Sequence, residues 1–133
     1  MIVGGKIERV EADKKSDGKI EGLSINITLD DIKVKDENLE INYTYSAKYE
    51  KGVGEIKIIG VLYAKEDKKT AKEISEIWKK EKTARKLPME YTSALISAIN
   101  YTGSANGTLV ARVLNLSPPL VPPKLQLESE PKK

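Results

Sequence analysis

Residues 87–116 read LPMEYTSALISAINYTGSANGTLVARVLNL, and this stretch decides how the rest of the chain folds. No charged residue stands between Glu90 and Arg112, although 32% of the whole sequence is charged. So long an uncharged run in a charged chain is expected to be buried. Pro88 and Glu90 favour a helix start, because proline suits the first helical position and an acid suits the first turn. The stretch therefore predicts a long buried helix.

The predicted helix has one apolar face and one face of small polar side chains. Tyr91, Leu95 and Ile99 recur at helical spacing, and the opposite face carries serines and Asn100. Small uncharged side chains contact water poorly and let another backbone approach closely. We therefore expect this helix to be buried twice, against its own sheet and against a copy of itself, with burial in its own core alone as the alternative. The residues expected at the subunit interface are Tyr91, Leu95, Ser97, Ala98, Asn100 and Gly103.

A membrane span is not expected, although the uncharged run is long enough to cross a bilayer. Hydroxyl and amide side chains recur along it, and each is costly in lipid. The amino terminus, Met1 to Lys6, has no basic start followed by an apolar core, so it does not resemble a secretory signal. We expect a cytoplasmic protein without a membrane partner.

The composition indicates one domain with a balanced surface. The chain has 133 residues, with 23 Lys and Arg against 20 Asp and Glu, which gives a net charge of +3. This balance predicts no strong nucleic-acid field. Cysteine and histidine are absent, so no disulfide, thiolate or imidazole chemistry is possible. We expect a single domain over residues 1–125 and a flexible tail over residues 126–133. The richness in Lys, Glu and Ile leans towards a thermophile source.

Four strands are predicted before the helices. Residues 7–12 form a short edge strand, and residues 23–34 alternate apolar with polar until Asp30-Asp31, where the phase changes and a bulge is expected. Residues 39–50 alternate most clearly. Residues 51–54 predict a hairpin turn, because glycine adopts a positive φ there, and residues 55–64 return as the fourth strand.

A charged helix is predicted over Thr70–Lys86, ahead of the uncharged one. Thr70 and Glu73 have the spacing of a capping box at its start. In the uncharged helix, Gly103 and Gly107 either permit close helix contact or end the helix. After it, Pro118, Pro119, Pro122 and Pro123 require an extended chain. The expected fold class is α+β, a four-stranded antiparallel sheet with helices packed on one face.

The fourth strand is apolar on both faces, which is typical of a strand covered on both sides. The second face is a candidate surface for unfolded polypeptides, which need exposed apolar side chains that accept many sequences. Packing within an oligomer is the alternative. The expected polypeptide-binding residues are Ile59, Val61, Tyr63, Trp78, Leu120 and Val121.

No residues in the sequence predict catalysis, a metal or a cofactor. Asp30-Asp31 stands beside lysines and is expected to be a solvated bend, and Gly52-Val53-Gly54 lacks the later glycine of a dinucleotide loop. Tyr43, Tyr45 and Tyr49 have the composition of a stacking platform for single-stranded nucleic acid. They share a face with Leu39 and Ile41, however, so we expect them to be core.

The order of four strands, helices and a proline-containing extended end resembles the bacterial export chaperone SecB and its relatives. The uncharged helix over residues 87–99, Gly107-Thr108 and the segment from Leu114 to Leu120 carry the resemblance, and Leu114 to Pro118 is its most specific part. The family's second helix after the proline segment is absent, and a charged helix around Trp78 is inserted. The early strands carry no clear acidic patch of the kind with which the bacterial proteins dock the SecA motor.

The resemblance implies a homotetramer, a dimer of dimers with long helices between two sheets, that holds unfolded chains without ATP. It leads us to expect a non-enzymatic chaperone-like protein for non-native polypeptides, of the class that serves protein transport. An oligomeric scaffold or adaptor for one dedicated protein partner is the second hypothesis, and a nucleic-acid binder is the third. The sequence leaves open whether the assembly is a dimer or a tetramer.

Overall fold

The computed structural model describes residues 1–18, 22–81, 87–120 and 123–125. Its strands are β1 (Ile2–Lys14), β2 (Leu23–Lys35), β3 (Asn38–Tyr49), β4 (Gly54–Lys65) and β5 (Pro123–Leu125). Its helices are α1 (Lys68–Glu81) and α2 (Met89–Leu114), and a short 3-10 turn covers Glu50–Gly52. The expected tail over residues 126–133 lies outside the described residues.

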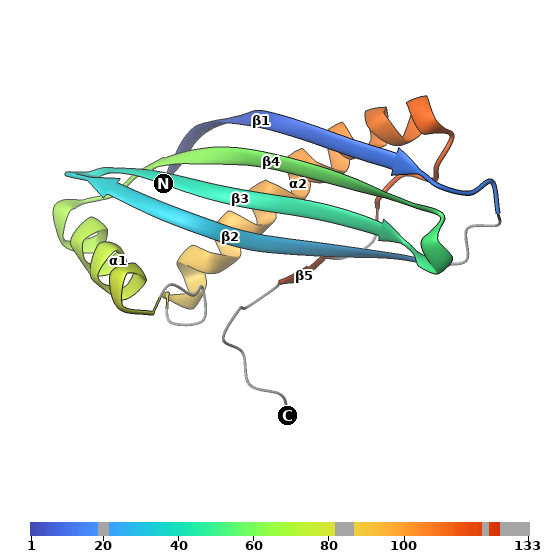
Figure 1. Cartoon of the computed structure of the whole chain (residues 1–133). Coiled ribbons are helices and arrows are strands. Elements are labelled where there is room, and N and C mark those ends of the chain that lie inside the picture. The colour runs from blue at the N-terminus through green and yellow to red at the C-terminus, as the bar shows by residue number, and fades with distance from the viewer. Residues whose placement is uncertain (19–21, 82–86, 121–122, 126–133) are drawn as a thin grey trace.

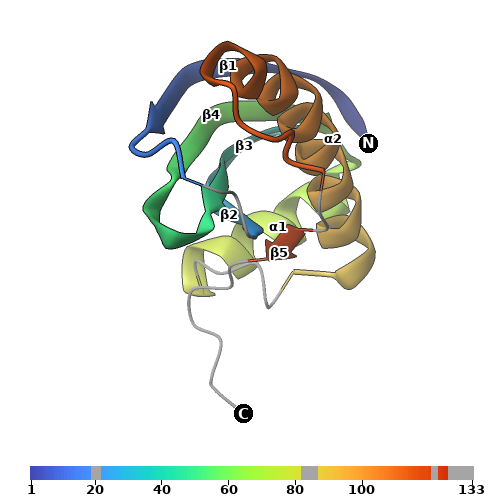
Figure 2. The same ribbon diagram turned by 90° about the vertical axis from the view of Figure 1, so that its right-hand side faces the viewer.

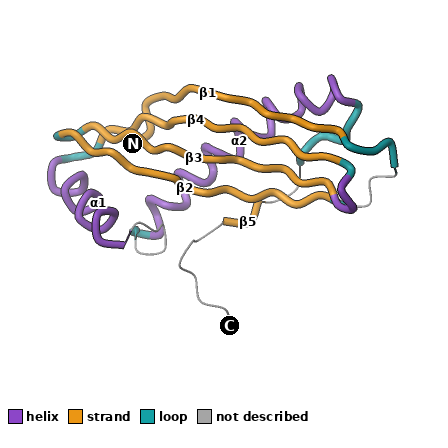
Figure 3. The backbone as a smooth tube through the Cα atoms, viewed as in Figure 1, coloured by secondary structure: helices purple, strands orange, loops and turns teal. Residues whose placement is uncertain are grey.

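The first four strands form one antiparallel sheet, as the sequence predicted (Figure 1). The strand order is β1-β4-β3-β2-β5, so β4 and β3 are central, and β5 adds in parallel to the edge of β2. Both helices lie on the concave side of the curved sheet (Figure 2), and α2 runs along its length (Figure 3). The predicted α+β class, with helices on one face, is confirmed.

The predicted bulge lies in β2, where the pairing with β3 shifts between Leu29 and Asp31. The extra residue lets Leu29 and Ile32, three positions apart, both face the core. The Asp31 carboxylate stabilises the bulge because its Oδ1 accepts a hydrogen bond from the Ile32 N–H at 2.9 Å. The same oxygen accepts a hydrogen bond from Trp78 Nε1 at 3.0 Å, which ties α1 to the bulge.

The two tight connections between strands use positive φ angles. Asp36 has φ 57° between β2 and β3, and Lys51 and Gly52 have φ 60° and 68° between β3 and β4. The hairpin predicted over residues 51–54 is therefore confirmed, with its left-handed conformation shared between Lys51 and Gly52.

The core lies between the sheet and the helices. Alternate residues of β2, β3 and β4 point towards the helices, and Tyr43, Tyr45 and Tyr49 are buried among them, as expected. From α2 the core receives one row of residues at four-residue intervals. This row is Leu95, Ile99, Gly103, Gly107 and Ala111.

Three element boundaries differ from the predictions. β1 extends over Ile2–Lys14, beyond the predicted residues 7–12, because it pairs with β4 along that whole length. α1 begins at Lys68 instead of Thr70, and the end predicted over residues 82–86 lies outside the described residues. Its first turn is capped by Asp67, whose Oδ1 accepts the Thr70 N–H at 2.7 Å, so Thr70 is not the capping residue. The sequence left open whether Gly103 and Gly107 end the uncharged helix; α2 continues through both to Leu114, with Asn115 as its C-cap at φ 58°. Among the described residues, no helix is long and apolar enough to cross a membrane.

Candidate protein-binding surface

The outer face of α2 is exposed, uncharged and largely apolar. It is a row of residues at four-residue intervals, offset by two from the buried row and so on the opposite side of the helix. Tyr101 is 78% exposed, Leu109 61% and Val113 83%. Large apolar side chains at such exposure, with small neighbours and no charge before Arg112, form a surface suited to another protein. We call this row, Ser97, Tyr101, Ala105, Leu109 and Val113, the α2 outer face.

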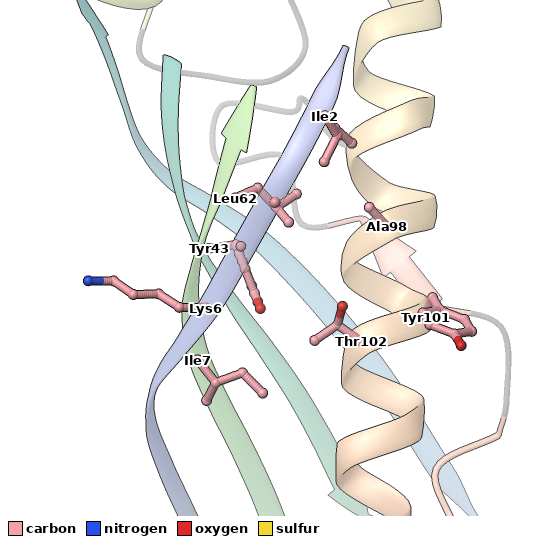
Figure 4. Close-up of a pocket in the computed structure, with 10 residues that line it drawn as sticks. Ile2, Lys6, Ile7, Tyr43, Leu62, Ala98, Tyr101 and Thr102 are labelled. Atoms are coloured by element: carbon pink, nitrogen blue, oxygen red, sulfur yellow. The ribbon is translucent and has the colours of Figure 1, made fainter. Parts of the chain in front are cut away.

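An apolar groove of about 430 Å³ runs between β1 and α2, beside the α2 outer face (Figure 4). Ile2 and Leu62 point into the space between the strands and the helix, and Ala98 faces them from α2. Lys6 points away from α2, where its Nζ lies 3.4 Å from the Glu8 carboxylate. The groove is lined by Ile2, Gly4, Gly5, Lys6, Ile7, Tyr43, Leu62, Ala98, Tyr101 and Thr102.

β1 forms one edge of the sheet along the same side of the molecule, and it carries alternating charges. Arg9 Nε lies 2.6 Å from the Glu11 carboxylate, close to the Lys6–Glu8 pair. Charged side chains on an edge strand discourage the addition of a further strand. The β1 edge beside the groove is therefore protected against strand pairing.

No family model, curated protein or solved structure matches this chain. The chemistry of the surface must therefore be inferred from the residues that the fold brings together.

Of the five expected polypeptide-binding residues that the structure describes, three lie together and two lie apart from them. Ile59, Val61 and Tyr63 lie on the sheet face that points away from the helices, where Val61 is buried among its neighbours. Trp78 is only 3% exposed, because it lies on the buried face of α1 and its indole N–H donates to Asp31. Leu120 is 69% exposed beyond the end of α2, and Val121 lies outside the described residues. Trp78 is thus a core residue in this conformation.

The expected subunit-interface residues divide between the two sides of α2. Leu95 is fully buried against the sheet, and Gly103 lies against the Tyr45 ring, so neither is available to another subunit. Their apolar or small character reflects contact with the chain's own sheet. Ser97 is exposed on the α2 outer face, and Ala98 is half-buried at the groove.

Two further expected interface residues, Tyr91 and Asn100, are half-buried. Burial raises the pKa of Tyr91, and the nearby Glu66 carboxylate adds to this effect, so the phenol stays neutral. The side-chain oxygen of Asn100 is buried, without a hydrogen-bond partner among the described residues. Both side chains therefore direct polar atoms inwards.

Sequence reasoning missed Tyr101, Leu109 and Val113, the largest apolar side chains of the α2 outer face. The signal was available, because these residues continue the four-residue spacing that starts at Ser97. The row is easily overlooked since the buried row has the same spacing and similar composition.

Proposed function

We propose that this chain is a cytoplasmic, ATP-independent chaperone-like protein that self-associates through the α2 outer face and holds non-native polypeptides. The observation that supports this proposal best is the exposed, charge-free α2 outer face beside an open apolar groove. The resemblance to SecB implies the same function and an assembly in which long helices meet.

Self-association follows from the cost of leaving this face in water. Covering a large apolar side chain contributes about 1.5–3 kcal/mol, and Tyr101, Leu109 and Val113 lie along one helix. α2 has 26 residues and is therefore about 39 Å long. Ser97 and Ala105 leave room for a second backbone between the larger side chains. A two-fold arrangement would place the same row of a second copy against this one.

Polypeptide holding requires a surface that accepts many sequences. Apolar contacts are not directional, so the groove and the uncharged helix face select for exposed apolar side chains rather than for one sequence. Unfolded chains offer such side chains, whereas folded proteins bury them. Nucleic acid is disfavoured as the occupant because Lys6, the cation at the groove, points away from it.

The test is suppression of aggregation without nucleotide. Several denatured proteins of unrelated sequence are diluted into buffer with and without the purified chain, and light scattering is followed. We expect scattering to fall to a low plateau near equimolar chain. Unchanged scattering of every client at a several-fold excess of chain would reject the proposal. A pull-down that returns a single protein would instead favour the dedicated-adaptor hypothesis.

A further inference from the structure

β5 shows that the free edge of β2 accepts an extended segment. Pro123, Lys124 and Leu125 pair in parallel with Ile25, Asn26 and Ile27 (Figure 1). β2 has 13 residues, and within the described part of the chain β5 pairs with three of them. A strand that is held by its sheet on one side offers its remaining backbone groups as a template for another chain.

The edge that β5 occupies is rigid and bounded. Ile25 and Ile27 are fully buried in the core, which fixes the strand in place. The bulge between Leu29 and Asp31 breaks the regular ladder, and the Trp78–Asp31 hydrogen bond brings α1 to that point. A continuous template therefore extends from Leu23 to Leu29.

The chain is anchored just before it reaches this edge. Leu116 donates its N–H to the Ala111 carbonyl at 2.8 Å, and the Tyr49 hydroxyl donates to the Ser117 carbonyl. The Pro119 side chain is fully buried against Gly107, where an added Cβ would lie 2.8 Å from Pro119 Cγ. The contacts of Leu116, Ser117 and Pro119 thus tether β5 close to β2.

The pairing itself is weak. Pro123 has no backbone N–H, and the N–H groups of Lys124 and Leu125 point to opposite sides of the strand, so at most one of them donates to β2. Each net hydrogen bond changes an equilibrium by about two- to tenfold. The remaining stability of the pairing comes from tethering, because the tether keeps β5 at a high local concentration beside β2. A longer extended chain that pairs from Leu23 to Leu29 would form more hydrogen bonds and displace β5.

We propose that the β2 edge from Leu23 to Leu29 is a strand-acceptor site for an extended polypeptide, and that β5 is the built-in occupant that a client displaces. This inference rests on the proposed function and adds a binding mode to it. Backbone pairing is independent of side-chain sequence, which suits a protein that holds many unfolded chains.

The test compares three full-length proteins. Lys124→Pro with Leu125→Pro removes the backbone N–H of both residues, including the one that faces β2, and Lys124→Ala with Leu125→Ala is the matched control that keeps them. The probe is a fluorescent synthetic peptide with the sequence of residues 120–128, and its anisotropy is titrated against each protein. A second peptide is N-methylated at the alternate residues whose N–H groups face β2 in the β5 register, so it cannot donate to the ladder.

We expect the peptide to bind the double-proline variant roughly tenfold more tightly than the wild type or the alanine control, and the N-methylated peptide to lose this gain. An unfolded client should then displace the bound peptide. Equal affinity for all three proteins, or full retention by the N-methylated peptide, would overturn the acceptor site. Peptide binding without displacement by any unfolded client would overturn the client assignment. Failure of the wild type to suppress aggregation would reject the proposed function, while the peptide titration would still report on the edge.

Discussion

Gly103 of α2 lies directly against the ring of Tyr45 of β3, with no space for a side-chain carbon between them. A Cβ added at Gly103 would lie 2.2 Å from Tyr45 Cδ2, far inside van der Waals contact. The glycine lets the middle of the long helix approach the central part of the sheet. It therefore sets the spacing between the layers and leaves the α2 outer face on the far side of the helix.

Gly103→Ala should destabilise the fold although alanine favours helices over glycine by about 1 kcal/mol. The methyl group must displace a buried ring, and overpacking of this kind costs about 1–3 kcal/mol. Urea unfolding at fixed protein concentration measures the change. Tyr45→Leu should reduce the penalty of Gly103→Ala in the double variant, because it removes the ring. A Gly103→Ala protein at least as stable as the wild type would contradict this packing.

Trp78 should behave as a buried reporter that does not contact clients. Its side chain is 3% exposed and its indole N–H donates to Asp31, so acrylamide should quench its fluorescence weakly and addition of an unfolded client should leave its emission unchanged. Trp78→Phe should lower the free energy of unfolding by about 1.5–3 kcal/mol, since the hydrogen bond to a charged group is lost. Asp31→Asn keeps an acceptor oxygen, so it should lower the free energy of unfolding by less than Trp78→Phe does. A red-shifted, readily quenched tryptophan would show that the Trp78 side of α1 is not packed against the sheet.

The sequence predicted the central fold well because side-chain period reports burial directly. The alternation from Leu39 to Tyr49 identified β3, and the change of phase at Asp30-Asp31 identified the bulge. The length of β1 was not predictable in this way. Its apolar residues are irregularly spaced, and its extent is set by pairing with β4, a contact between distant parts of the chain.

The candidate surface was predicted in part. Absence of charge in α2 predicted a helix with two contact faces; the structure shows the face against the sheet and leaves Ser97 exposed on the other side, with Ala98 half-buried at the groove. Leu95 and Gly103 were placed on the wrong side, because a charge-free helix offers no polar residues that mark the solvent face. The offset between the two rows depends on how α2 packs against Tyr45, which only the three-dimensional structure shows.

Alkaline pH should destabilise the protein through its buried tyrosines. Burial raises the pKa of Tyr49 to about 12, and it also raises the pKa of Tyr43 and Tyr45 above the ordinary value of 10.0. Between pH 10 and 12 the unfolded chain loses phenol protons that the folded chain keeps, so the free energy of unfolding falls as pH rises. This stability is fully present below pH 10. Urea unfolding at pH 8, 10 and 11 should show the decline in the free energy of unfolding, and the decline should be smaller in Tyr49→Phe. If the free energy of unfolding falls equally steeply with pH in Tyr49→Phe, Tyr49 does not contribute.

Charge on the α2 outer face should dissociate the assembly without unfolding the subunit. Leu109→Glu with Val113→Glu places two carboxylates at residues that are 61% and 83% exposed, so the isolated fold tolerates them. In a self-associated state the carboxylates would be desolvated, and the loss of each apolar contact should weaken association about tenfold or more. Light scattering over a range of concentrations measures the mass, and circular dichroism checks the fold. Lys72→Glu, on the exposed surface of α1, is the matched control because it changes net charge by the same two units. The control should keep the wild-type mass. An unchanged mass in the double variant would place self-association on another surface. A monomeric wild type would exclude self-association.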